Sequence, residues 1–302
     1  MCNIVSKFFN QVMKRLLTVV CLLVGLVALA EVPGSEKQIL VDLYESTNGK
    51  HWVRKWNLKE PVDTWYGVTV RDNRVVGIEL FHNNLMGPLP ESLGQLQQLE
   101  TLNVAFNNLT GQLPATIFKL RKLRVLKLEM NRLKGELPET VGNLTELREL
   151  SVFNNFLSGR IPNGIGSLKR LEVLNLSSNQ FFGRIPESIG ELNNLRALGL
   201  FENQLYGDIP ESMGNLAQLK ELVLSNNRLG GAIPESFGRL ASLEVLQLQN
   251  NEFNSYRNLA NMQTDKLLVF DYDEEESEID FKNFDFSRTR MADTKFEDDV
   301  DK

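Results

Sequence analysis

The feature of this chain that most restricts its fold is an internal repeat with a constant step of 24 residues. Asparagine keeps this step at eight positions, and glycine and proline each keep it at seven. So regular a period predicts a stack of similar structural units rather than one compact domain. The repeated residues are Asn83, Asn107, Asn131, Asn155, Asn179, Asn203, Asn227 and Asn251; Gly87, Gly111, Gly135, Gly159, Gly183, Gly207 and Gly231; and Pro90, Pro114, Pro138, Pro162, Pro186, Pro210 and Pro234.

One copy of the repeat indicates how each unit folds into a coil. Leu102 and Val104 are two residues apart, which predicts a short strand with both side chains inward. We expect the Asn107 amide to turn inward and to bind backbone groups where the chain leaves the strand. Gly111 permits a backbone conformation that is costly for other residues, and Pro114 fixes φ and ends regular pairing. One coil cannot bury its own leucines, so stacking must supply the core.

The complete frame, LxxLxLxxNxLxGxIPxxLGxL, resembles the plant-type leucine-rich repeat over roughly residues 76–270. The resemblance implies an α/β repeat fold, a curved right-handed solenoid with a parallel β-sheet on its concave face. Its convex side is expected to be irregular or 3-10 helical, built from stretches such as Leu93 to Leu99. Similar proteins include the ectodomains of plant receptor-like kinases and polygalacturonase-inhibiting proteins.

The residues before the array resemble the N-terminal cap of such proteins. Residues 37–56 resemble its helical part, and residues 64–70 resemble its Cys-x-Trp-x-Gly-Val-x-Cys segment. Thr64 and Val70 lie about where the plant proteins have cysteines, so the resemblance is closer to cysteine-free secreted relatives in bacteria and some protists. We expect three tryptophans to close this end by aromatic packing. They are Trp52, Trp56 and Trp65.

The segment over 1–30 has the pattern of a signal peptide. Lys14 and Arg15 precede an apolar run over 16–29, and Ala28-Leu29-Ala30 is a small-x-small cleavage site. A retained membrane anchor is the alternative, although the run of about 14 residues is shorter than the ~20 of a spanning helix. The division predicted is a signal peptide over 1–30, a cap over 31–75, a repeat array over 76–270 and an acidic tail over 271–302.

Both cysteines of the chain lie in the predicted signal peptide. Lipid attachment at Cys21 is a weaker alternative, because Val20 stands where a small residue is expected. After cleavage the chain would hold no cysteine, so an exported protein of this kind must obtain its stability from packing. Cys2 is the other cysteine.

Charge is distributed unevenly along the chain. The net charge of −6 combines three unopposed cations in 1–30, a nearly neutral body, and thirteen acids against five bases in 271–302. A near-neutral body argues against a nucleic-acid partner, which selects a concentrated basic face. In the tail, four apolar residues recur every five positions, like a pentapeptide repeat, but we expect a partly ordered acidic extension. These residues are Phe281, Phe286, Met291 and Phe296.

The repeat decays toward the C-terminus. The eighth copy keeps Phe253 but lacks the glycine and the proline. Leu267, Phe270 and Tyr272 still keep the repeat step from the preceding copy, which predicts a ninth strand. Terminal repeats are atypical because one face meets water.

Residues that carry catalytic or metal chemistry are scarce. His51 and His82 are the only histidines, no Cys–His pair exists outside 1–30, and no glycine-rich phosphate loop is present. The acidic run over 271–278 lacks the glycine turn of a helix-loop-helix calcium site. We therefore expect no catalytic residue, no cofactor and no metal ion.

The remaining candidate is the surface between the inward leucines, which the resemblance places on the concave face. One column along it reads Phe81, Ala105, Glu129, Phe153, Ser177, Phe201, Ser225 and Gln249. A second, neighbouring column contains His82, Phe106 and Met130, and Phe156 lies one step past its asparagine. Exposed aromatics on a rigid sheet are typical anchors for a partner, although Leu-Phe-x-Asn is also a common variant in the family. The candidate partner-binding residues are Phe81, Phe106, Lys127, Glu129, Met130, Phe153, Phe156 and Phe201.

Together these patterns predict a non-enzymatic, extracytoplasmic recognition module that binds a protein or a carbohydrate on its concave face. The alternative is a structural or adhesive component of the cell envelope, attached through the acidic tail. Either way, we expect a secreted or cell-surface protein with no stable membrane span in its mature chain. If the concave aromatics are not the site, the charged cluster of Lys127, Glu129 and Arg132 is the next candidate.

Overall fold

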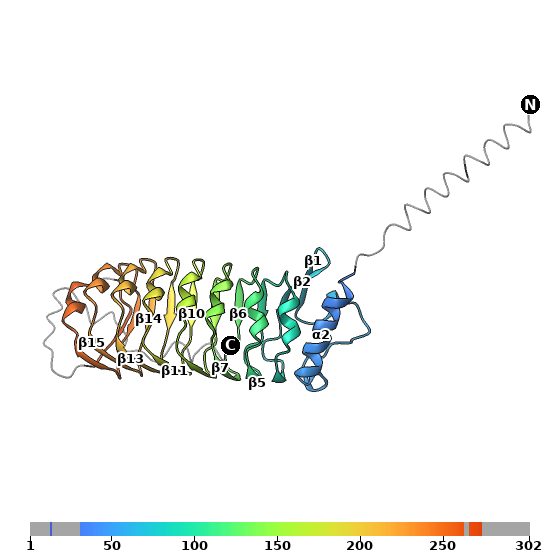
Figure 1. The fold of residues 1–302 in the computed structure, drawn as a ribbon, viewed down its shortest axis with the longest axis horizontal. Helices are drawn as coiled ribbons and strands as arrows, with labels where there is room; N and C mark the ends of the chain where they lie inside the picture. The colour runs from blue at the N-terminus through green and yellow to red at the C-terminus, as the bar shows by residue number, and fades with distance from the viewer. Residues whose placement is uncertain (1–12, 14–30, 263–265, 274–302) are drawn as a thin grey trace, which may run out of the picture.

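The computed structural model describes residues 13, 31–262 and 266–273, which form an elongated stack of coils (Figure 1). Helix α2 (Gly34–Ser46) lies at one end, and the coils follow one another along the long axis. Among these described residues, no helix combines the length and apolar character that crossing a membrane requires. The predicted signal peptide and most of the acidic tail, with Phe281, Phe286, Met291 and Phe296, lie outside the described residues.

Each coil contributes one short strand to a ten-stranded sheet. The first two strands pair antiparallel, and all later neighbours are parallel with a step of one repeat, so that Leu102 lies beside Leu126. The predicted ninth repeat strand is confirmed as the last of the sheet. The strands are β1 (Val68–Arg71), β2 (Arg74–Glu79), β4 (Thr101–Asn103), β6 (Val125–Lys127), β8 (Glu149–Ser151), β10 (Val173–Asn175), β12 (Ala197–Gly199), β14 (Glu221–Val223), β16 (Val245–Gln247) and β18 (Val269–Asp271).

A second, eight-stranded sheet was not predicted from the sequence. Its strands follow the repeated asparagines and contain the repeated glycines, so the glycine lies within the pairing rather than ending it; Gly111, for example, has φ of 82°. Neighbouring strands of this sheet pair residues that are slightly less than one repeat apart in sequence. Lys134, for example, lies beside Phe156 and not beside Ser158. The strands are β3 (Met86–Pro88), β5 (Asn108–Gln112), β7 (Arg132–Glu136), β9 (Phe156–Gly159), β11 (Gln180–Gly183), β13 (Gln204–Asp208), β15 (Arg228–Ala232) and β17 (Glu252–Ser255).

The helical turn predicted after the repeated proline is a short 3-10 helix. In seven coils the proline is the residue immediately before the helix, where its fixed φ suits the first turn and its missing N–H is not needed. The 3-10 helices are η1 (Gly49–His51), η2 (Val62–Thr64), η3 (Glu91–Gln95), η4 (Ala115–Lys119), η5 (Glu139–Asn143), η6 (Asn163–Ser167), η7 (Glu187–Glu191), η8 (Glu211–Asn215), η9 (Glu235–Arg239) and η10 (Arg257–Asn261).

One continuous core runs the length of the stack, and the repeated asparagines link its coils. Leu102 and Val104 are fully buried, as the two-residue alternation predicted. Asn107 Oδ1 accepts hydrogen bonds from the backbone N–H groups of Asn83 at 3.0 Å and Leu85 at 2.9 Å, in the preceding coil. Its Nδ2 donates to the carbonyl oxygens of Leu80 and Val104, both at 2.9 Å. The predicted inward amide is thus confirmed, and it satisfies backbone groups that no water reaches.

The N-terminal cap is closed by tryptophans, as predicted. The Trp52 and Trp56 rings meet edge to face with centroids 4.8 Å apart, and the Trp56 and Trp65 rings stack at 4.9 Å. Each indole N–H donates to a backbone carbonyl, so the buried rings leave no donor unpaired. The buried Glu36 carboxylate of α2 accepts from Arg74 Nε at 2.6 Å and from the Val75 N–H at 2.8 Å, which fixes the cap to the first sheet.

Candidate functional site

The candidate site is the concave column: Phe81, Ala105, Glu129, Phe153, Ser177, Phe201, Ser225 and Gln249. Each of these residues follows an inward side chain just beyond a strand of the ten-stranded sheet. These residues continue the hydrogen bonding of the sheet one position past the strands. From Ala105 to Gln249, the carbonyl oxygen of each column residue accepts a hydrogen bond from a backbone N–H of the preceding coil. The bond from the Met130 N–H to the Phe153 oxygen, at 2.8 Å, is one example. Successive residues of the column therefore lie about 4.8 Å apart.

Large and small side chains alternate along the middle of this column. Phe153 and Phe201 are half-buried, whereas Ser177 between them is 3% exposed and Ser225 beyond Phe201 is 1% exposed. A serine between two much larger neighbours is covered by them, so the hydroxyls lie deeper than the rings on this face. Phe81, at the N-terminal end of the column, is 49% exposed.

Several buried polar atoms of this face lack hydrogen-bond partners. Within the described part of the chain, five buried side-chain N or O atoms have no partner in the protein, and all five lie on this sheet face. An unsatisfied buried polar group costs about 1–3 kcal/mol, so these atoms require water or a ligand. The atoms are Glu129 Oε2, Ser177 Oγ, Ser225 Oγ and Gln249 Oε1 in the concave column and Gln247 Nε2 in β16 beside it.

Glu129 is the charged member of the column. Burial is the main effect on its carboxyl group and raises its pKa above the usual 4.5, while its own backbone N–H, the Ser151 hydroxyl and Lys127 act in the opposite direction. Lys127 does not neutralise it directly, because its Nζ forms an ion pair with Glu149 Oε1 at 2.8 Å. Glu129 therefore offers a partly desolvated acceptor beside the Phe153 ring.

The neighbouring column predicted from the sequence is a row of chain reversals. Phe106 and Met130, with the residues at the same repeat position, all have φ between 47° and 56°, the left-handed conformation that turns the chain from the first sheet to the second. The Phe106 ring packs on Phe81 with centroids 5.0 Å apart, and Asn154 Nδ2 lies 3.0 Å from Met130 Sδ. This corner column is His82, Phe106, Met130, Asn154, Ser178, Glu202, Asn226 and Asn250.

Phe156 and Arg132 do not belong to the concave face. Phe156 begins β9 and Arg132 begins β7, so both lie beyond the corner, on the second sheet. The expectation that Phe156 joins the concave aromatics, and that Arg132 clusters with Lys127 and Glu129, therefore needs correction. The reason is the left-handed corner residue, which redirects the chain before the asparagine.

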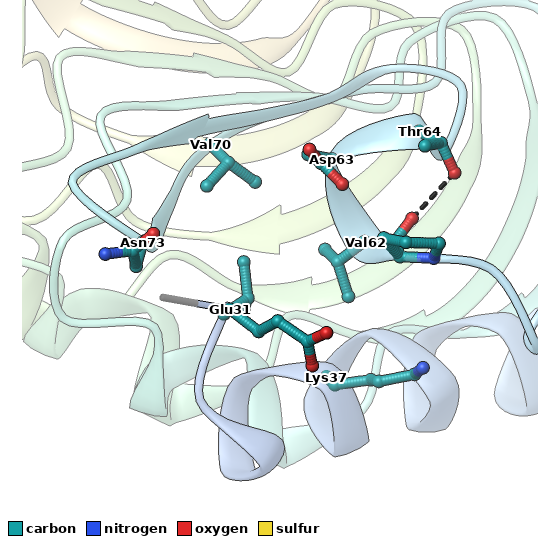
Figure 2. A pocket seen from close by; sticks show the side chains of 9 residues that line it. Glu31, Lys37, Val62, Asp63, Thr64, Val70 and Asn73 are labelled. Carbon is teal, nitrogen blue, oxygen red and sulfur yellow. Dashed lines mark hydrogen bonds between the residues drawn. The ribbon is translucent and has the colours of Figure 1, made fainter. Parts of the chain in front are cut away.

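A separate hollow of about 280 Å³ lies beside the N-terminal cap. Thr64 and Val70, which lie about where the plant proteins have cysteines, both line it. The Thr64 hydroxyl donates to the Pro61 carbonyl oxygen at 2.7 Å (Figure 2). All residues that line this hollow come from the cap, and none is a predicted site residue. Among the described residues, no three His, Cys, Asp or Glu side chains lie together in a way that would hold a metal ion. The concave column is the better candidate site.

Comparisons with known proteins agree with this architecture. Residues 78–183 and 163–282 each match a family model described as a leucine-rich repeat region. The ectodomain of the Arabidopsis thaliana receptor kinase GASSHO1/SCHENGEN3, solved in complex with CASPARIAN STRIP INTEGRITY FACTOR 2, is 28% identical with a TM-score of 0.71. That match covers 78% of this chain and 32% of that one.

Two further structures are similar. The Arabidopsis receptor kinase HAESA, solved in complex with the peptide hormone IDA and the co-receptor SERK1, is 29% identical with a TM-score of 0.70, over 80% of this chain and 41% of that one. A leucine-rich repeat protein of Leptospira interrogans is 33% identical with a TM-score of 0.55, over 65% and 48% of the two chains. This chain thus spans between a third and a half of the length of these proteins.

Proposed function

Because this chain belongs to the leucine-rich repeat family, we propose that it is a non-enzymatic, extracytoplasmic recognition module that binds an extended segment of a protein partner. The binding surface is the concave column, centred on Phe153 and Phe201. The complex of the HAESA ectodomain with a peptide hormone supports a polypeptide as the class of ligand. A preformed surface without a reacting group supports binding rather than catalysis.

The observation that carries the proposal is the alternation of half-buried rings with buried, unpartnered polar atoms. Phe153 and Phe201 lie two coils apart, about 10 Å. Three residues of a polyproline II segment span about 9.3 Å, so two side chains three residues apart in such a segment would each meet one of the two rings. A backbone offers both N–H and C=O groups, and the unpartnered atoms include donors and acceptors: the hydroxyls of Ser177 and Ser225, Glu129 Oε2 and Gln247 Nε2.

The extracytoplasmic location rests on the sequence. The pattern over 1–30 predicts a cleavable signal peptide, and residues 31–302 contain no cysteine. Expression of the full chain in a secreting host, followed by N-terminal sequencing of the released protein, tests this part. Release with Glu31 as the first residue supports it, whereas retention in the membrane fraction with residues 1–30 intact contradicts it.

The test of the binding function starts with the released chain as bait for the extracellular fraction of its source. The captured partner is then titrated calorimetrically against the wild type and the Phe153→Ala/Phe201→Ala variant. A matched control is Phe156→Ala/Phe182→Ala, which removes two exposed rings from the second sheet. Loss of affinity in the first variant alone supports the proposal. Equal affinity in all three proteins places the site elsewhere, and capture of a glycan instead of a protein replaces the polypeptide ligand with a carbohydrate.

A further inference from the structure

The outer face of the second sheet carries a surface that the proposed function does not use. Its strands follow one another along one edge of the stack, as β5, β7, β11 and β13 show in Figure 1. From β7 to β15, this face presents three aromatic rings and five cations, and all eight side chains are exposed. This second-sheet patch consists of Phe156, Phe182, Tyr206, Arg132, Lys134, Arg160, Arg184 and Arg228.

The cations of the patch have no partners. Within the described residues, none of the five forms an ion pair or a side-chain hydrogen bond, although nine ion pairs form elsewhere, such as Lys220 with Glu244 at 2.7 Å. Two acids, Glu136 and Asp208, share the face and also remain outside those pairs. The patch is therefore positive on a body that is nearly neutral, and its charges are not balanced within the array.

The register of the sheet places cations directly beside rings. Lys134 pairs with Phe156, and Tyr206 pairs with Arg228. The stem of Arg184 lies over Gly207, because a Cβ atom at that glycine would come within 3.2 Å of Arg184 Cγ. The glycines thus leave room for the stems of Arg160 and Arg184, on a face where no acidic side chain pairs with them.

Such a surface is costly to leave open. Like charges one strand apart repel each other, and Phe156, Phe182 and Tyr206 expose 43–53% of their areas on three consecutive strands. Contiguous exposed apolar area on a soluble protein usually marks an interaction site. A ligand that fits must bring negative charge and apolar side chains together.

We propose that residues 274–302 of this same chain dock on the second-sheet patch. This segment carries eleven acids against five bases, and four phenylalanines are interspersed with them. It therefore supplies both of the properties that the patch lacks: carboxylates for the unpaired cations, and rings to cover the exposed aromatics. The phenylalanines are Phe281, Phe284, Phe286 and Phe296.

The start of this segment is fixed at the corner between the two sheets, two residues after β18 of the first sheet ends. Asp273, the last described residue, accepts hydrogen bonds from the N–H groups of Asn250 at 2.9 Å and Asn251 at 3.3 Å. The Tyr256 hydroxyl also donates to it, at 3.3 Å. Burial, followed by the nearby Asp273 charge, raises the Tyr256 pKa to about 12, so this phenol keeps its proton and its donor role at neutral pH. The chain leaves the array at the corner column, where β17 begins after Asn251.

The distances permit the docking. From β17 to β11 there are three strand steps, about 14 Å, and about ten extended residues reach ~33 Å. A tethered segment of this kind meets the patch at an effective concentration in the millimolar range. Weak charge pairs and ring contacts therefore suffice to hold it, and raised salt should release it.

Zero-length carbodiimide cross-linking of the full chain tests the proposal, because it joins a lysine amine to a carboxylate only when the two are in contact. We expect Lys134 to form links with acids of 274–302 in preference to Lys119 and Lys169, which lie on or near the 3-10 helices. Mixing ¹⁴N and ¹⁵N chains separates links within one chain from links between chains. The variant Arg160→Glu/Arg184→Glu should reduce the Lys134 links at least about tenfold.

The matched control is Arg121→Glu/Arg239→Glu, which changes the net charge equally at exposed arginines away from the patch and should leave the links unchanged. Three results overturn the proposal: links spread evenly over all lysines, equal loss in both variants, or links only between different chains. Because Phe153 and Phe201 lie on the other sheet, failure here leaves the concave-face function untouched, and failure of that function leaves this result untouched.

Discussion

The concave column and the second-sheet patch hold similar rings on the same coils, but their polar neighbours are in opposite states. In the column, Ser177 and Ser225 are buried between larger side chains and have no partner. In the patch, Arg160 and Arg184 are exposed and lack partners for a different reason, namely an excess of one charge. A row of buried neutral groups without partners favours a ligand that brings hydrogen bonds, whereas an exposed cationic face favours one that brings negative charge.

The difference arises from the corner column. In the first sheet, before the corner, each residue pairs with the residue one full repeat away, so equivalent side chains of adjacent coils lie side by side. Beyond the corner, the register is slightly shorter than the repeat, and the glycines leave space into which arginine stems extend. One repeated sequence thus builds two surfaces that favour different ligands. Each of the following substitutions is expected to affect either one of these surfaces or both.

The largest effect is expected from a change that damages both surfaces together. Leu176 is fully buried in the coil that also carries Ser177 and Phe182. Leu176→Ala should lower the free energy of unfolding by about 2–5 kcal/mol through the cavity that it leaves. Denaturant unfolding measures this loss, and Gln180→Ala at an exposed position of the same coil is the control, expected within about 0.5 kcal/mol. Equal stability of Leu176→Ala and wild type would contradict the conclusion that Leu176 belongs to a core that supports both surfaces.

The next largest effect is expected from a substitution that changes the concave column and leaves the second-sheet patch intact. Phe153→Ala/Phe201→Ala should weaken binding of the concave partner at least about a hundredfold, because truncation of an anchoring ring commonly costs ~2 kcal/mol or more. Both rings are half-buried outside the core, so thermal unfolding should change little compared with Leu176→Ala. Calorimetric titration and a melting curve on the same preparation measure both quantities. Unfolding as severe as that of Leu176→Ala would mean that these rings belong to the core.

A smaller loss of affinity is expected when the unpartnered serine hydroxyls are removed. Ser177→Ala/Ser225→Ala removes two hydrogen-bonding groups while it leaves the rings in place. If a ligand uses them, affinity should fall about tenfold, since a hydrogen bond contributes roughly 0.5–1.5 kcal/mol. Stability of the free protein should stay equal or rise, because neither hydroxyl has a protein partner. A drop in stability without a drop in affinity would assign the hydroxyls to the fold instead of the site.

Much of the fold could be predicted because its signals are local and repeated. The step from Leu102 to Leu126 sets the register of the first sheet, and the inward amide of Asn107 follows from the need to satisfy backbone groups. The second sheet escaped prediction because Gly111 looks like a strand breaker. The left-handed corner escaped because residues as different as Phe106 and Glu202 occupy it, and neither is typical of that conformation.

The site was predictable only in part. The period placed Phe153 and Phe201 in one column, but the burial of Ser177 depends on side chains of two other coils. Phe156 was assigned to the wrong face because no residue type marks the left-handed corner between it and Phe153: that position differs from coil to coil. Likewise, a body that is nearly neutral in total conceals the cations of the second-sheet patch, since their clustering depends on the shorter register of that sheet.

The smallest expected effect concerns the one acid of the concave column. Burial raises the pKa of Glu129, so the folded protein binds a proton more readily there than the unfolded chain does. The contribution of this group to stability is therefore complete below its ordinary pKa of 4.5 and is lost as the pH rises through the higher value of the folded state. At neutral pH, the ionised carboxylate lowers stability, in contrast to the acids that form surface ion pairs.

Glu129→Gln keeps the shape of this side chain and removes its titration. At pH 7 the variant should melt above the wild type by a few degrees at most, about 4 °C or less for an array of this size, and the difference should shrink as the pH falls toward 4.5. Glu244→Gln is the control, because it breaks the ion pair with Lys220 away from Glu129 and should not stabilise the protein. A Glu129→Gln variant that melts below the wild type at pH 7 would show that Lys127 and Ser151 outweigh the burial of the carboxylate. The surface around Glu129 would then suit a cationic group of the ligand better than a neutral amide, and the partner search should turn to basic segments.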